Sequence, residues 1–271
     1  MAGDTTPIEQ LLKRERVVVA AGLVIITGLA WWWLLVGAGT GMSVFAMTTW
    51  AFPPPVRAPV VQEWTLTYAI VMFFMWWIMM IAMMTPSAAP MILLYAHAYR
   101  HEVKLGRLRA TTTPTFAFAL GYLLVWMAFS MIATGMQWGL ERVGLLHAML
   151  MWSVEPMLSG ALLLAAGVYQ FTPLKNVCLE QCRSPAQFLA ANFRPGVIGA
   201  MRMGWKHGVI CLGCCWALMA LLFVGGIMNL VWIAGLAIFV LLEKVTAHGN
   251  WIARVGGIAM IGGGFWVIGH G

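Results

Sequence analysis

The hydrophobic positions of this chain are grouped in long apolar runs rather than in an alternating pattern. Runs of about 20 apolar residues are typical of membrane-spanning helices, because in lipid every backbone N–H and C=O must be hydrogen-bonded within its own segment. The fold class we expect is therefore all-α, a polytopic membrane helix bundle. Its runs predict about seven spans, at residues 17–39, 65–99, 114–139, 155–170, 204–226, 229–247 and 252–268.

Two of these runs carry further information. The first run, residues 17–39, is too long for a signal-peptide core and has no convincing cleavage site, so we expect it to be retained as a span. The second is the longest and contains Pro86 and Pro90, which predict a kinked helix. We expect one transmembrane domain over residues 1–271, with a cytoplasmic segment at 1–16 and the helix bundle at 17–268.

Charge supports the membrane assignment. Charged residues make up 9% of the 271 residues and hydrophobic residues 62%, which is too little charge to cover a soluble domain of this length. With the N-terminus in the cytoplasm, all but Arg57 and Arg142 of the 16 lysines and arginines lie on the cytoplasmic side. This asymmetry accounts for the net charge of +7, so we expect no nucleic-acid partner. The C-terminus is then external.

The fifth span contains an unusual set of soft side chains. Met203, His207, Cys211 and Cys214 fall within an arc of about 80° on an ideal helix, with Cys215 beside them. Thiolate, thioether and imidazole groups are the ligands that Cu(I) prefers. One face of this helix is therefore a candidate metal site.

The second span has a face of methionines. Met75, Met79 and Met83 lie one turn apart, and Met72, Met80, Met84 and Met91 fill the same or the adjoining sector. Thioethers spaced in this way suit a Cu(I) path, because they bind the ion without losing a proton. The alternative is packing, since methionine fills irregular gaps in helix bundles well. The third span, which includes Tyr122, is expected to serve packing alone.

The remaining cysteines and the buried acid add to the candidate site. Cys178 and Cys182 are four residues apart and share a helical face, and the odd total of 5 cysteines favours reduced thiols over a disulfide framework. They could equally be ordinary interfacial residues. Glu243 needs a partner in apolar surroundings, either Lys206 or Arg202 in a structural pair or a metal ion or proton. The neighbouring Lys244 can extend to the interface.

Three polar segments allow two interpretations each. His97 and His101 share a helical face as a possible metal pair or as interfacial groups. The external segment 139–156, with Glu141, His147 and Glu155, could capture a cation or form an amphipathic interfacial helix. The proline-rich segment 40–64 could be an ordered cap or a mobile loop.

Four blocks of sequence carry a family resemblance. They are WWIMMIAMMTPSAAPM at 76–91, AAGVYQFTPLKNVCLEQCRSP at 165–185, GVICLGCCWALM at 208–219 and MNLVWIAGLAIFVLLEK at 228–244. The chain resembles a bacterial family of predicted metal-binding integral membrane proteins, which implies a multi-pass protein of the inner membrane. The resemblance implies these motif positions: Met79, Met83, Met84, Cys178, Cys182, Cys211, Cys214, Cys215 and Glu243.

The leading hypothesis is a membrane protein that binds, translocates or delivers copper as Cu(I), with the lipid bilayer, a larger membrane complex or a metal-acceptor protein as partners. No nucleotide-binding motif and no catalytic residues are apparent, so active pumping by this chain alone is not expected. The alternatives are an accessory or scaffold subunit of a larger membrane complex and a membrane thiol oxidoreductase. The metal-site candidates are Cys211, Cys214, Cys215, His207, Cys178, Cys182, Met75, Met79, Met83, Met84 and Glu243.

Overall fold

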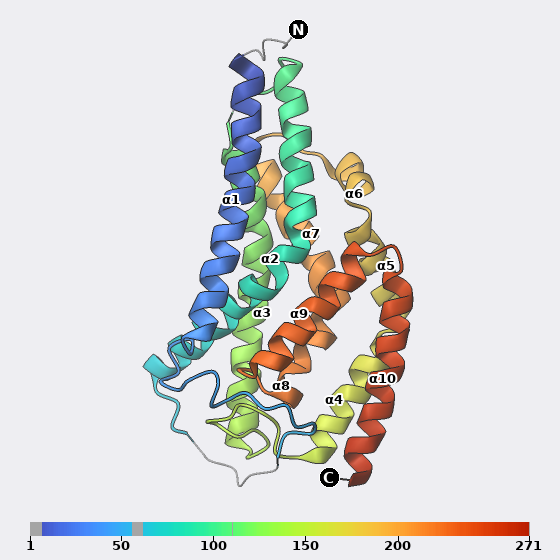
Figure 1. Cartoon of the computed structure of the whole chain (residues 1–271). Coiled ribbons are helices and arrows are strands. Elements are labelled where there is room, and N and C mark those ends of the chain that lie inside the picture. Colours follow the sequence, from blue (N-terminus) through green and yellow to red (C-terminus); the bar gives the residue numbers. More distant parts are fainter. Residues whose placement is uncertain (1–6, 56–61, 110, 271) are drawn as a thin grey trace.

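The computed structural model describes residues 7–55, 62–109 and 111–270, with side chains from Val17 onward. The helices of this part run along one long axis, and the start of α1 and the end of α10 lie at opposite ends of the molecule (Figure 1). The only extended pairing in the described ranges is an isolated bridge between Leu146 and Ser153, so the all-α class is confirmed. The helices are α1 (Pro7–Leu35), α2 (Leu66–Lys104), α3 (Thr113–Arg142), α4 (Pro156–Tyr169), α5 (Pro173–Arg183), α6 (Pro185–Asn192), α7 (Gly196–Ala220), α8 (Leu222–Gly225), α9 (Leu230–Val245) and α10 (Gly249–His270).

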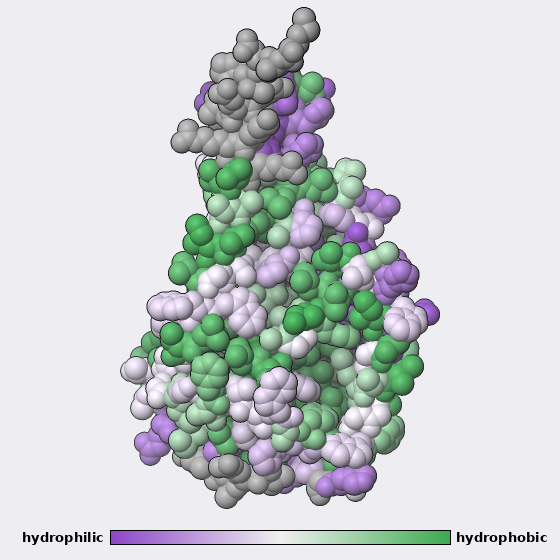
Figure 2. Space-filling model, in the orientation of Figure 1, coloured by the Kyte–Doolittle hydropathy of each residue, from purple (hydrophilic) through white to green (hydrophobic). Residues whose placement is uncertain are grey.

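Five of the described helical segments are long and apolar enough to cross a membrane, namely α1 from Val17, α2, α3, α7 together with α8, and α10. The helices α4 and α5 form a sixth candidate as one span bent by 65°. The predicted span at 229–247 corresponds to α9, which has 16 residues and is short for a bilayer. The count is therefore five or six where the sequence predicted about seven. The visible face is largely apolar, with hydrophilic side chains at its upper end, along its right edge and at its base (Figure 2).

The helix α2 is continuous over 39 residues although it contains Pro86 and Pro90. It begins at Thr65, whose hydroxyl accepts a hydrogen bond from the Tyr68 N–H at 3.2 Å. Partway along it changes direction (Figure 1), because Pro86 has no N–H to give to the carbonyl of Ala82 and its ring crowds the preceding turn. The predicted proline kink is present.

Glycines allow the central helices to approach closely. A Cβ atom on Gly204 of α7 would overlap the backbone of Phe118 in α3, and a Cβ atom on Gly121 would overlap the backbone of Met201. Gly160 in α4 and Gly264 in α10 make the same kind of close contact. Small residues at these crossings bring backbones together, as they do in membrane helix bundles. Through its contact with α3, α7 is fixed in the centre of the molecule.

The described part of the proline-rich segment is an ordered cap. The side-chain amide of Asn229 donates to the Thr49 carbonyl at 3.1 Å, and the Leu230 N–H donates to the Thr48 hydroxyl at 3.1 Å. Phe52 stacks on Trp232 with ring centroids 5.5 Å apart. Arg57 and Pro59 lie outside the described residues.

The segment between α3 and α4 forms turns rather than a helix. The Nδ1 atom of His147 accepts the backbone N–H groups of Met149 and Leu150 at 3.3 and 3.2 Å. The predicted amphipathic helix is therefore wrong here. The histidine ring holds the backbone in a turn, because a side-chain acceptor satisfies N–H groups that a helix would satisfy internally.

Candidate metal centre

The helix α7 carries three cysteines into the protein interior. Cys211, Cys214 and Cys215 are each 1% exposed. The thiols of Cys214 and Cys215 donate to the carbonyl oxygen of Cys211 at 3.0 and 2.9 Å. These bonds turn the side chains back along the helix and keep three sulfur atoms on one side of α7.

The helix α5, which packs against α7, adds a fourth thiol. The sulfur of Cys182 lies 3.9 Å from the sulfur of Cys214, and it also interacts with Cys211. Cys182, Cys211, Cys214 and Cys215 are called the thiol cluster below. The cluster joins two helices that are separated in sequence by the short helix α6, and its four cysteines are free of disulfide bonds.

Cys211 has two polar neighbours that sequence analysis did not place there. The Lys244 ammonium of α9 lies 2.9 Å from its sulfur, and the Tyr122 hydroxyl of α3 lies 3.1 Å away. Lys244 is 7% exposed, so the expectation that it extends to the interface is wrong. Its nitrogen finds a sulfur partner and the Ser87 hydroxyl, at 3.3 Å, inside the bundle. Tyr122 is more than a packing residue, although its pattern gave no signal of this contact.

His207 lies one turn before Cys211 and is packed among aromatic rings. Its ring stacks on Tyr122 with centroids 5.7 Å apart and meets the edge of Phe188 at 5.5 Å. The side chain is 3% exposed, and its Nδ1 atom is buried without a hydrogen-bond partner. Buried polar atoms are nearly always bonded. A buried imidazole nitrogen without a partner beside thiols fits a soft metal ligand.

The predicted methionine face of α2 is completely buried. Met72, Met75, Met79, Met83 and Met84, called the methionine column below, are each at most 2% exposed. The column approaches the thiol cluster through Tyr122, whose hydroxyl donates to the Met84 carbonyl at 3.1 Å and contacts Cys211. Ser87, which accepts from Lys244, lies on the next turn. The two soft faces are thus connected through α3 and α9.

Other predicted ligands lie apart from the cluster. Cys178 is half-buried beside Gly213 of α7, near Cys214 but without a hydrogen bond to the cluster. The Glu243 carboxylate accepts from Lys175 at 2.7 Å and from Gln170 at 3.0 Å. Lys206 bonds Asn192 instead, so the predicted partner of Glu243 was wrong. Arg202 is not that partner either. His97 and His101 are both exposed.

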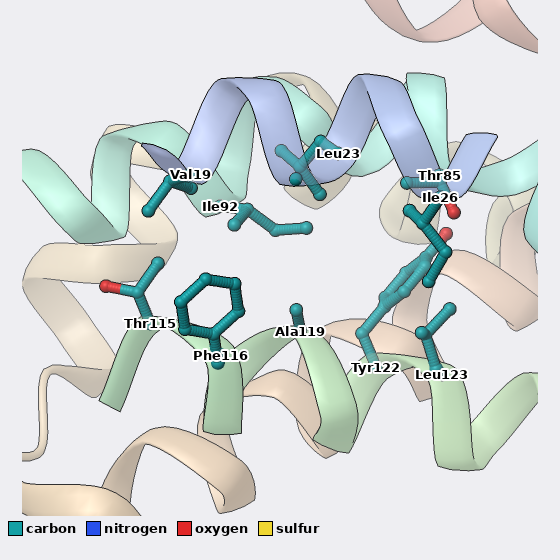
Figure 3. A pocket seen from close by; sticks show the side chains of 11 residues that line it. Val19, Leu23, Ile26, Thr85, Ile92, Thr115, Phe116, Ala119, Tyr122 and Leu123 are labelled. Atoms are coloured by element: carbon teal, nitrogen blue, oxygen red, sulfur yellow. The ribbon is translucent and has the colours of Figure 1, made fainter. Parts of the chain in front are cut away.

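A cavity of about 100 Å³ lies beside the centre, between α1, α2 and α3. Its lining is apolar, and the Tyr122 ring projects from α3 at one end, close to Thr85 (Figure 3). The Thr85 hydroxyl is buried without a partner. Tyr122 therefore borders both this cavity and the thiol cluster.

The donor chemistry of the cluster fits a soft metal ion. Two sulfurs bound to one ion at the zinc–thiolate length of about 2.3 Å lie at most about 4.6 Å apart, and Cys182 and Cys214 fall within this limit. Among the described residues, however, no three His, Cys, Asp or Glu side chains are already arranged around a common point. Binding requires side-chain rotation, above all of the thiols now turned to the Cys211 carbonyl.

Comparison with known proteins gives one family. Residues 73–267 match the family PpoB2, which is described as a copper chaperone. Comparison with curated proteins and with solved structures gives no match. The match covers more than half of the chain, from within α2 to within α10, and includes every cysteine described above. The expectation of a metal-handling family is confirmed in this form: the chain belongs to the PpoB2 family of copper chaperones.

Proposed function

We propose that this protein is an integral membrane chaperone that binds Cu(I) at the thiol cluster and delivers it to an acceptor protein. The observation that carries the proposal is the convergence of three buried thiols of α7 with the half-buried thiol of Cys182 from α5, in a chain that belongs to a copper chaperone family. Cys182, Cys211, Cys214 and Cys215 are the proposed primary ligands, with His207 as a further donor.

The chemistry of the donors supports the monovalent ion. Thiolate and thioether sulfur are soft ligands that select Cu(I), whereas a hard ion would need oxygen ligands. Glu243 is taken up by Lys175 and Gln170, so we do not include it among the ligands. Cys178 is a candidate for an outer position from which copper exchanges with the cluster, because it lies next to α7 at Gly213.

The methionine column supports movement of the ion within the bundle. Met75, Met79, Met83 and Met84 provide neutral ligands at successive turns, so copper can exchange between similar sites without proton transfer. The end of the column at Met84 is one tyrosine away from Cys211. We propose that copper passes along the column to or from the cluster.

The membrane setting belongs to the same proposal. We propose one transmembrane unit in a bacterial inner membrane, with the N-terminus in the cytoplasm and the C-terminus outside. Copper bound among helices is not presented on a soluble surface, so the acceptor would be a membrane partner or a protein that docks at one end of the bundle. An accessory role in a larger membrane complex is compatible with such delivery.

Cysteine substitutions test the assignment. Purified protein in detergent under reducing conditions should bind Cu(I) near one equivalent per chain, measured by competition with a chromogenic Cu(I) chelator. Serine at Cys211, Cys214 and Cys215 together should remove this binding, because serine oxygen is a hard ligand. Cys178→Ser leaves all four proposed primary ligands in place and should retain most of it. Equal binding by the triple variant and the wild type would overturn the site.

A thiol oxidoreductase is the second candidate, because the sulfurs of Cys182 and Cys214 are 3.9 Å apart and could form a disulfide after a small rotation. Its reaction would require a substrate thiol to reach a sulfur by way of a mixed disulfide. Burial of Cys211, Cys214 and Cys215 opposes such access. A mixed disulfide trapped in a Cys214→Ser variant would favour this candidate.

A further inference from the structure

Lys244 has a buried charge whose principal partner is sulfur. The neighbouring carboxylate, Glu243, is paired with Lys175 at 2.7 Å. In the part of the chain that the structure describes, the other ion pair joins Arg107 and Glu102, so Lys244 has no carboxylate. Its ammonium lies 2.9 Å from the Cys211 sulfur and 3.3 Å from the Ser87 hydroxyl.

A buried ammonium is costly unless its charge is compensated. A negatively charged neighbour in a functional state would offset this cost for Lys244. The thiol cluster provides that charge when it holds copper. Each ligating thiol binds as a thiolate and gives its proton to water as the copper–sulfur bond forms. When two of the four cysteines bind as thiolates and the other two keep their protons, the Cu(I) complex has a net charge of −1.

We propose that Lys244 is a positioning residue for Cu(I), which holds a counter-charge beside the copper so that the two-thiolate complex together with the ammonium is neutral within the membrane. This inference rests on the proposed function above, because it assumes that the thiol cluster is the copper site. Lys244 does not coordinate copper in this arrangement. It stabilises the complex through its charge and holds Cys211 in place by direct contact.

The geometry favours this role over simple filling of space. Ser87 accepts from Lys244 and itself donates to the Met84 carbonyl at 2.9 Å. The ammonium is thus fixed between α2 and α7, at the point where the methionine column approaches the thiol cluster. Copper that moves from the neutral thioethers of the column to the anionic thiolates of the cluster therefore comes close to the Lys244 ammonium as it reaches the first thiolate.

The test compares Lys244→Met and Lys244→Arg in the full-length protein in detergent. Lys244→Met should weaken Cu(I) binding about 10- to 100-fold, the range seen when groups that support metal ligands are removed. Lys244→Arg keeps the charge and should restore affinity to within a few-fold of wild type. Ag(I), a soft ion of the same charge, should follow the same order. Lys206→Met, which removes an exposed lysine of α7, is the matched control and should have no effect.

A second readout separates charge from damage to the fold. Methionine in place of an ammonium that lacks a carboxylate partner should leave the unfolding temperature of the copper-free protein unchanged or raise it, while copper affinity falls. Unchanged or tighter Cu(I) binding by Lys244→Met would overturn the inference. Failure of wild-type protein to bind Cu(I) would instead overturn the proposed function, so the two failures are distinguishable.

Discussion

The ion pair of Lys175 and Glu243 is almost completely removed from solvent, with side chains 0% and 1% exposed. It joins α5 to α9, and Gln170 donates to the second carboxylate oxygen at 3.0 Å. A pair buried in this way is not necessarily stabilising compared with apolar residues, but loss of one partner leaves a buried charge uncompensated. The pair therefore constrains how α5 presents Cys182.

Glu243→Gln should destabilise the protein strongly. The substitution keeps the shape of the side chain but leaves the Lys175 ammonium without its counter-charge, which costs about 3–5 kcal/mol at buried pairs. We expect a marked fall in the unfolding temperature in detergent, measured by intrinsic tryptophan fluorescence.

Two controls make this prediction specific. Glu102→Gln breaks the exposed pair with Arg107, whose side chain is 67% exposed, and should change stability by at most about 1 kcal/mol. The double variant Lys175→Met with Glu243→Leu should recover much of the loss, because no charge is then buried. If the Glu243→Gln protein unfolds at the same temperature as the wild type, Lys175 has found another partner.

The sequence predicted that Glu243 needs a partner but not which residue provides it. Lys175 lies 68 positions away, and only the bend between α4 and α5 turns it inward. The same limit applies to Lys244. A lysine near the end of an apolar run can extend to water, and only the tertiary position of Cys211 shows why this one does not.

At the scale of helices, periodicity was informative. It predicted that the methionines of α2 and the soft residues of α7 each share a face, and both sets are buried in the structure. It could not predict that Tyr122 and Lys244 connect these faces, because the contacts depend on how α3 and α9 pack against α7. The bend in α2 was predictable from Pro86 and Pro90. The predicted span at 229–247 was longer than α9 because it included the N-cap Asn229 and the two residues after Val245.

Gly204→Ala should disrupt the contact between α3 and α7. The added methyl group would overlap the carbonyl of Phe118, and backbone atoms cannot move aside as a flexible side chain can. Overpacking of this kind costs at least about 1–3 kcal/mol. Separation of the helices would also move Tyr122 from Cys211, so Cu(I) affinity and the unfolding temperature should both fall.

The control lies on the same helix pair. A Cβ atom at Gly135 of α3 would meet nothing within 4 Å, so Gly135→Ala should keep both stability and copper binding near wild type, since alanine favours helix over glycine. If both variants behave alike, close approach of α3 and α7 is not what fixes the thiol cluster.

For the whole molecule, the distribution of lysine and arginine predicts orientation, which packing alone does not determine. The ends of α2 and α3 that adjoin residues 105–112 lie at the end of the bundle where α1 begins (Figure 1). That end carries Arg107, whereas Met149 is in the turn after α3, which the charge distribution predicts to be external. Both side chains are exposed, at 67% and 47%, so cysteines placed there can report which side each end faces.

Labelling with a membrane-impermeant maleimide tests this orientation. Met149→Cys should react in cells whose outer membrane is permeable to the reagent, and Arg107→Cys only after the inner membrane is opened, because positively charged connections stay in the cytoplasm. Wild-type protein gives the background from Cys178 and Cys182, which are half-buried. The reverse labelling pattern would show that the protein is inserted in the opposite orientation. The Met72 end of the methionine column would then face the cytoplasm, and copper moving from the column to the thiol cluster would travel outward rather than inward.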